Sequence, residues 1–228
     1  MAGTAALVAP VGSAKAQVAV SASVVSDYRF RGLSLSDGRP TFSLTVNYDH
    51  PSGAYAGVSG LATATAHDGL KATGYQAFVG YAGRLKSGAS WDVGASRYDV
   101  TDYLDSRYRI QYEEVYAGIT AHNVSAHIYY SPNYLGEGIK ALYFDASTAF
   151  VPAPTWRLFA HAGVLAPLNP PPDAEMRNVQ VDLRAGVAKR FKACEVELAW
   201  THYGPSAEYP GGYPQSRDAL VAGATYHF

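Results

Sequence analysis

The chain has 228 residues with 18 Lys and Arg against 19 Asp and Glu, and this near balance excludes the strong positive field that collects nucleic acid. It contains 18 tyrosines, 22 glycines and two methionines, a composition that favours β structure over packed helices. The single cysteine, Cys194, excludes an intramolecular disulfide framework and a cysteine-rich metal site.

The first residues have the pattern of a secretory signal. An apolar stretch from Ala5 to Val11 is followed by Ala14, Lys15 and Ala16, a small-residue cleavage pattern. We expect residues 1–16 to be a signal peptide that lacks its positive start, and residues 17–228 to be the mature domain; a flexible tail is the alternative. No run approaches the roughly 20 apolar residues that a membrane helix needs, so a membrane location would require a barrel.

The mature chain divides into twelve segments with a period of two, most of them about 9–11 residues long, the length of a membrane-spanning strand. The predicted strands are 18–35, 41–50, 54–65, 75–85, 89–101, 112–121, 124–135, 140–151, 155–168, 178–191, 194–204 and 217–228. The sequence therefore predicts an all-β chain, an antiparallel up-and-down barrel of about twelve strands.

The connections alternate in length along the chain. Tight turns such as PSG, KSG, HN, PAP and KA follow the even segments, whereas long connections such as DYLDSRYRIQ and PSAEYPGGYPQS follow most odd ones. This asymmetry is typical of an outer-membrane barrel, with short periplasmic turns at one end and longer surface loops at the other.

The residue types on the two faces also favour a membrane barrel. In the segment 41–50, Phe42, Leu44, Val46 and Tyr48 alternate with polar residues, and aromatic residues near the segment ends fit interfacial girdles. The last stripe ends on Phe228, which we interpret as the assembly signal read by the barrel-insertion machinery.

The stretch SDYRFRGLSLSDGRP is unusual for a strand because it interleaves charges with aromatic residues. In strict alternation Asp27, Arg29 and Arg31 share one face, and Tyr28 and Phe30 share the other. An arginine on the lipid side would cost about 2–4 kcal/mol at the midplane, so we expect the charges to face the lumen and the aromatic side chains to face lipid. The charges then form either a constriction that selects solutes or a salt-bridge ladder with inward acids that fills the lumen.

This stretch and the following NYDHPSGAYAGVSG resemble the opening of the TorF-type porins, also catalogued as the conserved hypothetical outer-membrane family Gcw_chp. The likeness extends over essentially the whole mature chain, to Phe228. It implies a barrel and a transport role.

Further inward positions follow from the alternation. Five inward tyrosines either stack on sugar rings or fill a narrow barrel: Tyr98, Tyr116, Tyr129, Tyr143 and Tyr203. His127 and His161 are expected to be lumen hydrogen-bonding residues. The lumen or constriction candidates are Asp27, Arg29, Arg31, Asp49, Glu114, Asp145, Arg157, Asp182 and Arg184.

The sequence contains few residues arranged for catalysis or metal binding. Ser125 and His127 alternate onto one face, but that face is the lumen rather than the lipid rim where a barrel phospholipase needs its site. The seven histidines are dispersed, so we expect no metal and no cofactor.

The sequence therefore predicts a porin in the outer membrane of a Gram-negative bacterium. Its lumen would be narrow, lined by mixed charges and tyrosines, and would pass small hydrophilic solutes. The alternatives are a lipid-acting barrel enzyme and a non-conducting structural barrel; the expected partners are outer-membrane lipid, the insertion machinery and the solute, with no nucleic acid. The identity of the solute, the ion preference, the state of the lumen and the oligomeric state do not follow from the sequence.

Overall fold

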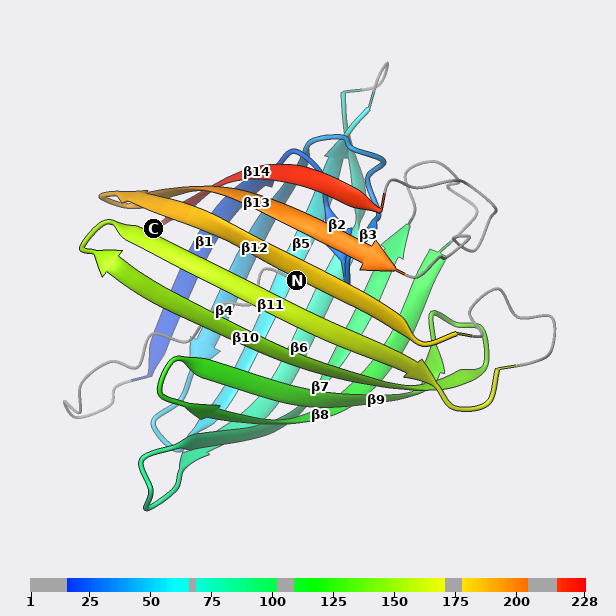
Figure 1. The fold of residues 1–228 in the computed structure, drawn as a ribbon, viewed down its shortest axis with the longest axis horizontal. Coiled ribbons are helices and arrows are strands. Elements are labelled where there is room, and N and C mark those ends of the chain that lie inside the picture. The colour runs from blue at the N-terminus through cyan, green and yellow to red at the C-terminus, as the bar shows by residue number, and fades with distance from the viewer. Residues whose placement is uncertain (1–15, 66–68, 102–108, 171–177, 205–216) are drawn as a thin grey trace.

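The computed structural model describes residues 16–65, 69–101, 109–170, 178–204 and 217–228, and the predicted signal peptide lies outside these ranges except for Ala16. Twelve long strands close into one antiparallel barrel, in which each strand pairs with its neighbours in the chain and β1 pairs with β14 (Figure 1). The wall strands are β1 (Gln17–Val25), β4 (Thr41–Asp49), β5 (Ala54–Ala64), β6 (Leu70–Arg84), β7 (Ser90–Thr101), β8 (Arg109–Ala121), β9 (Val124–Tyr134), β10 (Ile139–Ala153), β11 (Trp156–Pro167), β12 (Gln180–Phe191), β13 (Cys194–Gly204) and β14 (Asp218–His227). The described residues include no helix that could cross a membrane.

The predicted barrel is confirmed, and eleven of its twelve segments match a wall strand closely. The main differences at the ends are in β6, which begins at Leu70 within a stretch that the sequence suggested as a loop, and in β8 and β10, which are a few residues longer. The first segment is wrong beyond Val25. There the chain leaves the wall, and residues 26–40 form a separate unit before β4 begins at Thr41.

The two faces of the wall differ as the alternation predicted. On β4, Phe42, Leu44, Val46 and Tyr48 are all exposed to the outside, and the side chains between them point inward. On β13, Leu198 is 50% exposed whereas the next residue, Ala199, is 1% exposed. Because a folded chain that left this much apolar surface in water would be poorly soluble, the outer face fits the hydrocarbon of a bilayer.

The two ends of the barrel also differ. The connections 50–53, 85–89, 122–123, 154–155 and 192–193 are short and lie at one end, which we call the short-turn end; the chain enters β1 and leaves β14 there. The remaining connections lie at the opposite, long-loop end. Most of them are longer, as the sequence predicted, but the connections 65–69 and 135–138 are as short as 85–89 and 50–53.

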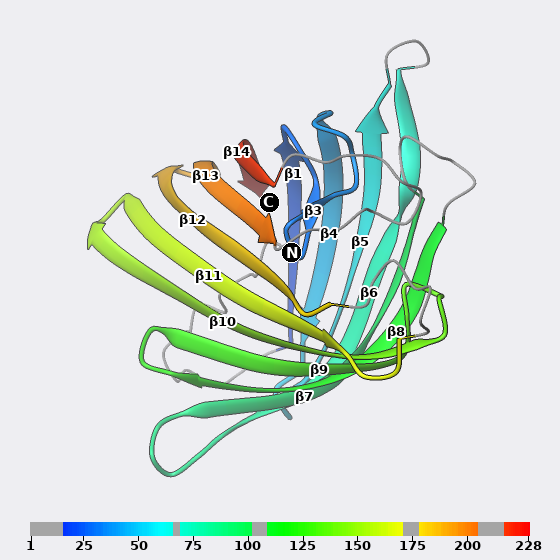
Figure 2. The same cartoon turned by 45° about the vertical axis from the view of Figure 1, so that its right-hand side comes forward.

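Residues 26–40 fold into the barrel from the long-loop end. They carry β2 (Arg29–Phe30) and β3 (Leu33–Ser34), which pair as a small hairpin separate from the wall. Figures 1 and 2 show this hairpin on the inner side of the ring, next to β1 and β4. We call residues 26–40 the plug segment.

The lipid-facing wall can be tested with two neighbouring residues of β4. Leu44 is 55% exposed outside, and Thr45 points inward, where its hydroxyl lies 2.9 Å from that of Ser59. We expect Leu44→Arg to lower the free energy of unfolding in phospholipid vesicles by about 2–4 kcal/mol, because the guanidinium then lies in hydrocarbon. Thr45→Arg should cost much less, since its charge lies in the lumen. Equal losses for both variants in urea titrations would contradict this placement.

Candidate functional site: the lumen and its plug

The plug segment is built around the buried carboxylate of Asp27. This carboxylate accepts hydrogen bonds from Arg29 Nε at 2.6 Å, Ser34 Oγ at 2.5 Å, Ser36 Oγ at 3.1 Å and the Gly38 amide at 3.2 Å. All four donors belong to the plug segment itself. The segment therefore satisfies the charge of Asp27 internally and forms a compact unit rather than an extended strand.

Arg31 points out of this unit and into the barrel wall. Its φ of 49° is in the left-handed region, and Gly32 follows with a φ of 79°. A side chain at Gly32 would come within 2.9 Å of the Asp182 Cβ, so the tight turn needs glycine for space as well as for backbone conformation. The turn aims the Arg31 guanidinium at Glu114 on β8, where Nη2 donates to Oε2 at 2.7 Å.

The Arg31–Glu114 ion pair is buried. The side chains are 7% and 1% exposed, and Glu114 also accepts a hydrogen bond from Ser96 Oγ at 3.2 Å. Removing either partner would leave a charge without compensation in a site of low dielectric constant. The pair therefore fixes the position of the hairpin inside the barrel.

Aromatic rings surround the same guanidinium. The distances from its central carbon to the ring centroids are 3.9 Å for Tyr143, 5.1 Å for Phe30 and 5.4 Å for both Tyr129 and Tyr134. At these distances the ring faces attract a cation. Arg31 Nε is buried without a hydrogen-bond partner, and the rings and Glu114 surround the rest of the guanidinium.

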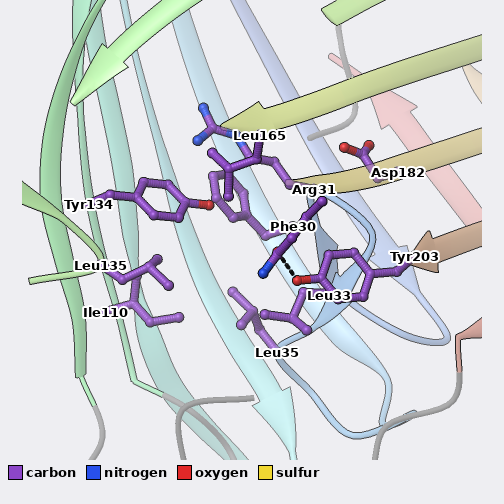
Figure 3. Close-up of a pocket in the computed structure, with 11 residues that line it drawn as sticks. Phe30, Arg31, Leu33, Leu35, Ile110, Tyr134, Leu135, Leu165, Asp182 and Tyr203 are labelled. Carbon is purple, nitrogen blue, oxygen red and sulfur yellow. Dashed lines mark hydrogen bonds between the residues drawn. The ribbon is translucent and has the colours of Figure 1, made fainter. Parts of the chain in front are cut away.

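Apolar contacts complete the closure of this end. The Phe30 ring lies 4.9 Å from that of Tyr98 and 6.3 Å from that of Tyr112, and Leu33 and Leu35 are also buried. Figure 3 shows these plug side chains facing residues of β8, β9, β11, β12 and β13. The cavity left between them has a volume of about 10 Å³, about the room of one water molecule. The long-loop half of the lumen is closed.

Burial also changes ionisation within the plug segment. It raises the pKa of the Tyr28 phenol to about 12, so this side chain stays neutral. Burial alone would lower the pKa of Arg31, but the attraction of Tyr112 and Glu114 outweighs it and holds that pKa well above its usual value. Arg31 therefore keeps its charge.

A row of carboxylates and histidines runs along the inner wall from the other half of the lumen to the plug. Asp92, Gly118, His127, Asp145 and Gly163 are successive cross-strand partners on β7 to β11, and Asp182 on β12 continues the row. His127 Nε2 lies 3.3 Å from Asp92, and His127 Nδ1 lies 3.7 Å from Asp145. His161 similarly lies 3.0 Å from Asp182 and 2.9 Å from Ser147.

The glycines in this row make room for the contacts. A Cβ on Gly118 would lie 2.2 Å from the His127 ring and 2.6 Å from an Asp92 oxygen. A Cβ on Gly163 would lie 2.1 Å from Tyr143 Oη and 2.4 Å from an Asp182 oxygen. Each glycine thus lets polar side chains from the strands on either side meet across it.

This half of the lumen is accessible to water, unlike the closed half. Arg157 pairs with Glu195 and Arg184 pairs with Glu197, and the two arginine side chains are 30% and 23% exposed. Tyr55 Oη lies 2.8 Å from Tyr116 Oη and 2.9 Å from Asp92. The lining carries both signs of charge, mostly paired.

The predicted lumen residues separate into three groups. Arg31, Glu114 and Asp182 lie at or beside the plug, and Asp27 and Arg29 lie inside it. Asp145, Arg157 and Arg184 line the wet half. Asp49 is exposed at the last position of β4, at the short-turn end, apart from the other candidates.

The expected register of the opening stretch is wrong. Tyr28 and Phe30 were expected to face lipid, but Phe30 is 5% exposed and Tyr28 packs against the same buried cluster. Because the chain leaves the wall after Val25 and reverses at Arg31, strict alternation does not apply to it. Arg29 pairs with Asp27 in its own segment. Arg31 pairs with Glu114, an inward acid, which agrees with the alternative in which salt bridges fill the lumen.

Two residues of the wet half were missed in the sequence. Asp92 alternates with Tyr98 on the same face of a predicted strand, so its inward position could have been derived from that tyrosine. Tyr55 could not, because its contact with Asp92 on β7 passes over Gly80 on β6, the strand between them. All five tyrosines expected to point inward do so, and at the plug they fill space.

The candidate enzyme pair does not have catalytic geometry. Ser125 Oγ lies 2.9 Å from Thr120 Oγ1, whereas His127 contacts Asp92 and Asp145, and no hydrogen bond joins Ser125 to His127 in the described part of the chain. Within the described ranges no group of three or more His, Cys, Asp or Glu side chains is arranged to hold a metal ion.

Fold and lumen together define a β-barrel of the outer-membrane porin type. The chain belongs to the Gcw_chp family, described as bacterial protein of unknown function, which it matches over residues 10–213. This confirms the family expected from the opening motif but not the TorF-type name. A comparison with curated proteins finds no match.

The solved structures to which this chain is similar include two porins and the translocator domain of an autotransporter. The NanC porin has a TM-score of 0.58 at 11% identity, and the match covers 92% of this chain and 99% of that one. A mutant of the Rh. blastica porin reaches 0.39 at 12% identity over 94% and 100% of the two chains. The translocator domain of the autotransporter NalP from Neisseria meningitidis reaches 0.40 at 11% identity over 92% and 87%. The likeness to the NanC porin shows the fold of this chain.

The glycine gaps provide a stability test. We expect Gly118→Ala to lower the free energy of unfolding by about 1–3 kcal/mol, because the new methyl group displaces the His127 ring from Asp92. Gly60→Ala is the matched control, since a Cβ there meets nothing within 4 Å. It should leave stability unchanged or slightly higher. The prediction fails if urea unfolding in vesicles shows the same effect for both.

Proposed function

We propose that this protein is a porin-type channel of the Gram-negative outer membrane that passes small hydrophilic solutes. The observation that carries the proposal is the division of the lumen. One half is wet and lined by polar groups of the wall, and the other is closed by a segment that is not part of the wall. A barrel that served only as a scaffold could fill its interior with wall side chains alone.

The plug segment lies between two wall strands that are already paired at its ends. Val25 and Thr41, the residues at its two ends, are direct cross-strand partners on β1 and β4. A two-residue turn could therefore join these strands without changing the register of any strand. Residues 26–40 thus close the lumen without building its wall, which supports a role in controlling passage.

The lining supports small polar solutes rather than apolar ones. Asp92, His127, Asp145, Arg157 and Arg184 present hydrogen-bonding groups of both signs to the water-accessible half. Because most of these charges are paired, the lining does not create a strong field of one sign. We therefore propose hydrophilic solutes, without a strong preference for either sign of charge.

A non-conducting barrel is the second candidate, and the tight closure at the plug favours it. The lipid-acting enzyme has less support, because Ser125 and His127 have separate partners inside the lumen.

The orientation in the membrane is the same for each of these functions. We propose that the short-turn end faces the periplasm, because outer-membrane barrels have short turns there and longer loops at the cell surface. The side chain of Phe228 is 78% exposed, which makes it available to the insertion machinery that we propose as a partner.

Replacing residues 26–40 by Asn-Gly tests the channel proposal. The variant keeps all twelve wall strands and loses the plug, so we expect a much larger single-channel conductance in planar bilayers than that of the wild-type protein. The control replaces residues 86–88, in the turn between β6 and β7, by the same dipeptide and should conduct as the wild type does.

The outcome is decisive when insertion is verified separately. Heat-modifiable mobility on electrophoresis shows that each variant is a folded barrel. A plug-free barrel that folds and inserts but conducts no more than bare lipid would support the non-conducting scaffold and end the channel proposal.

A further inference from the structure

We propose that the site now occupied by Arg31 is a binding site for small organic cations of the guanidinium and alkylammonium type. Such a solute competes with Arg31 for Glu114, displaces the plug segment and so opens the lumen. The binding part concerns the barrel wall itself, and the opening part rests on the proposed channel function.

The site belongs to the wall and not to the plug. Glu114 lies on β8, Tyr129 and Tyr134 on β9 and Tyr143 on β10. Three of the four rings around the guanidinium therefore remain in place when the plug segment leaves. The departing residues take away the Phe30 ring, the apolar side chains of Leu33 and Leu35, and the cation itself.

The chemistry of the site selects one class of ligand. A buried carboxylate together with the faces of three tyrosine rings suits a cation that is weakly hydrated and has a flat or apolar surface. A guanidinium meets both requirements, as the position of Arg31 demonstrates, with Tyr143 at 3.9 Å and Glu114 at 2.7 Å. Small metal cations hold their water too strongly to use the ring faces.

The negative charge of the empty site favours binding. When Arg31 leaves, Glu114 keeps Ser96 as a hydrogen-bond donor but loses the cation paired with it, so its negative charge attracts another cation. Asp145 lies two residues from Tyr143 on the same inward face of β10, and Asp182 lies beside Gly32. These carboxylates add to the attraction for a cation in the lumen.

Two features of the plug segment favour its displacement from the site. The Asp27 carboxylate is satisfied by donors within residues 29–38, so this interaction survives displacement. Arg31 holds a left-handed backbone that an L residue rarely adopts, which opposes the bound conformation. The plug segment thus resembles a tethered ligand, with Arg31 as its binding group.

Chemical rescue of Arg31→Ala tests the binding site without requiring conduction. The purified variant in detergent micelles should melt below the wild type. Millimolar ethylguanidinium chloride, which copies the end of an arginine side chain, should raise its melting temperature by several degrees and saturate. Ethylammonium should act more weakly, and sodium chloride at the same ionic strength should give no saturable shift.

Two control variants separate the site from a general effect of salt. Arg31→Ala combined with Glu114→Gln lacks the buried carboxylate and should show no ethylguanidinium shift. Arg157→Ala also removes a lumen arginine, but its partner Glu195 keeps Arg190 at 3.6 Å, so no saturable shift is expected. The proposal is wrong if Arg31→Ala shows no shift beyond the sodium chloride control, or if the double variant shows the same shift.

The plug-free barrel gives a second readout if Arg31→Ala does not fold. It retains Glu114 and the three tyrosines, so ethylguanidinium should shift its melting temperature and reduce its conductance, and Glu114→Gln should abolish both effects. A plug-free barrel that shows the shift without conducting would keep the binding site and refute the channel. One that conducts without any response to ethylguanidinium would keep the channel and refute the binding site.

Discussion

The interior of this barrel is organised around the need to pair one buried charge. Arg31 is 83 residues away from Glu114 in the chain, and both side chains are almost fully buried where they meet. A guanidinium cannot lose its proton, so it enters a lumen of low dielectric constant only against a carboxylate. The hairpin, the left-handed turn at Arg31 and the tyrosines of β9 and β10 all meet at this pair.

Along the row of carboxylates and histidines, glycines alternate with large polar side chains on the inner face of the wall. Gly118 and Gly163 leave space in which polar groups from the two neighbouring strands meet. Because strand residues alternate between lipid and lumen, the same strands can carry an apolar outer band and a polar inner row. The lumen therefore has two regions, one filled by the plug segment and one accessible to water.

The sequence predicted the wall well because period two and loop length are local properties. The outward stripe of β4 and the inward tyrosines followed directly from alternation. The plug could not be predicted in this way, because alternation assumes an extended chain and Arg31 reverses it with a φ of 49°. Asp27 and Arg31 were identified as lumen residues, but their partners were not: Asp27 binds its own segment, and Glu114 lies on a strand far along the chain. Only the closed barrel brings Arg31 and Glu114 together.

A double-mutant cycle on Arg31→Met and Glu114→Gln tests the central claim most directly. Each single variant leaves one buried charge unpaired and should lower the free energy of unfolding in vesicles by about 3–5 kcal/mol. The double variant should lose clearly less than the sum, with a coupling of at least about 2 kcal/mol. Losses that add to within about 0.5 kcal/mol would show that the two residues do not interact, and would contradict a plug held in the lumen by this pair.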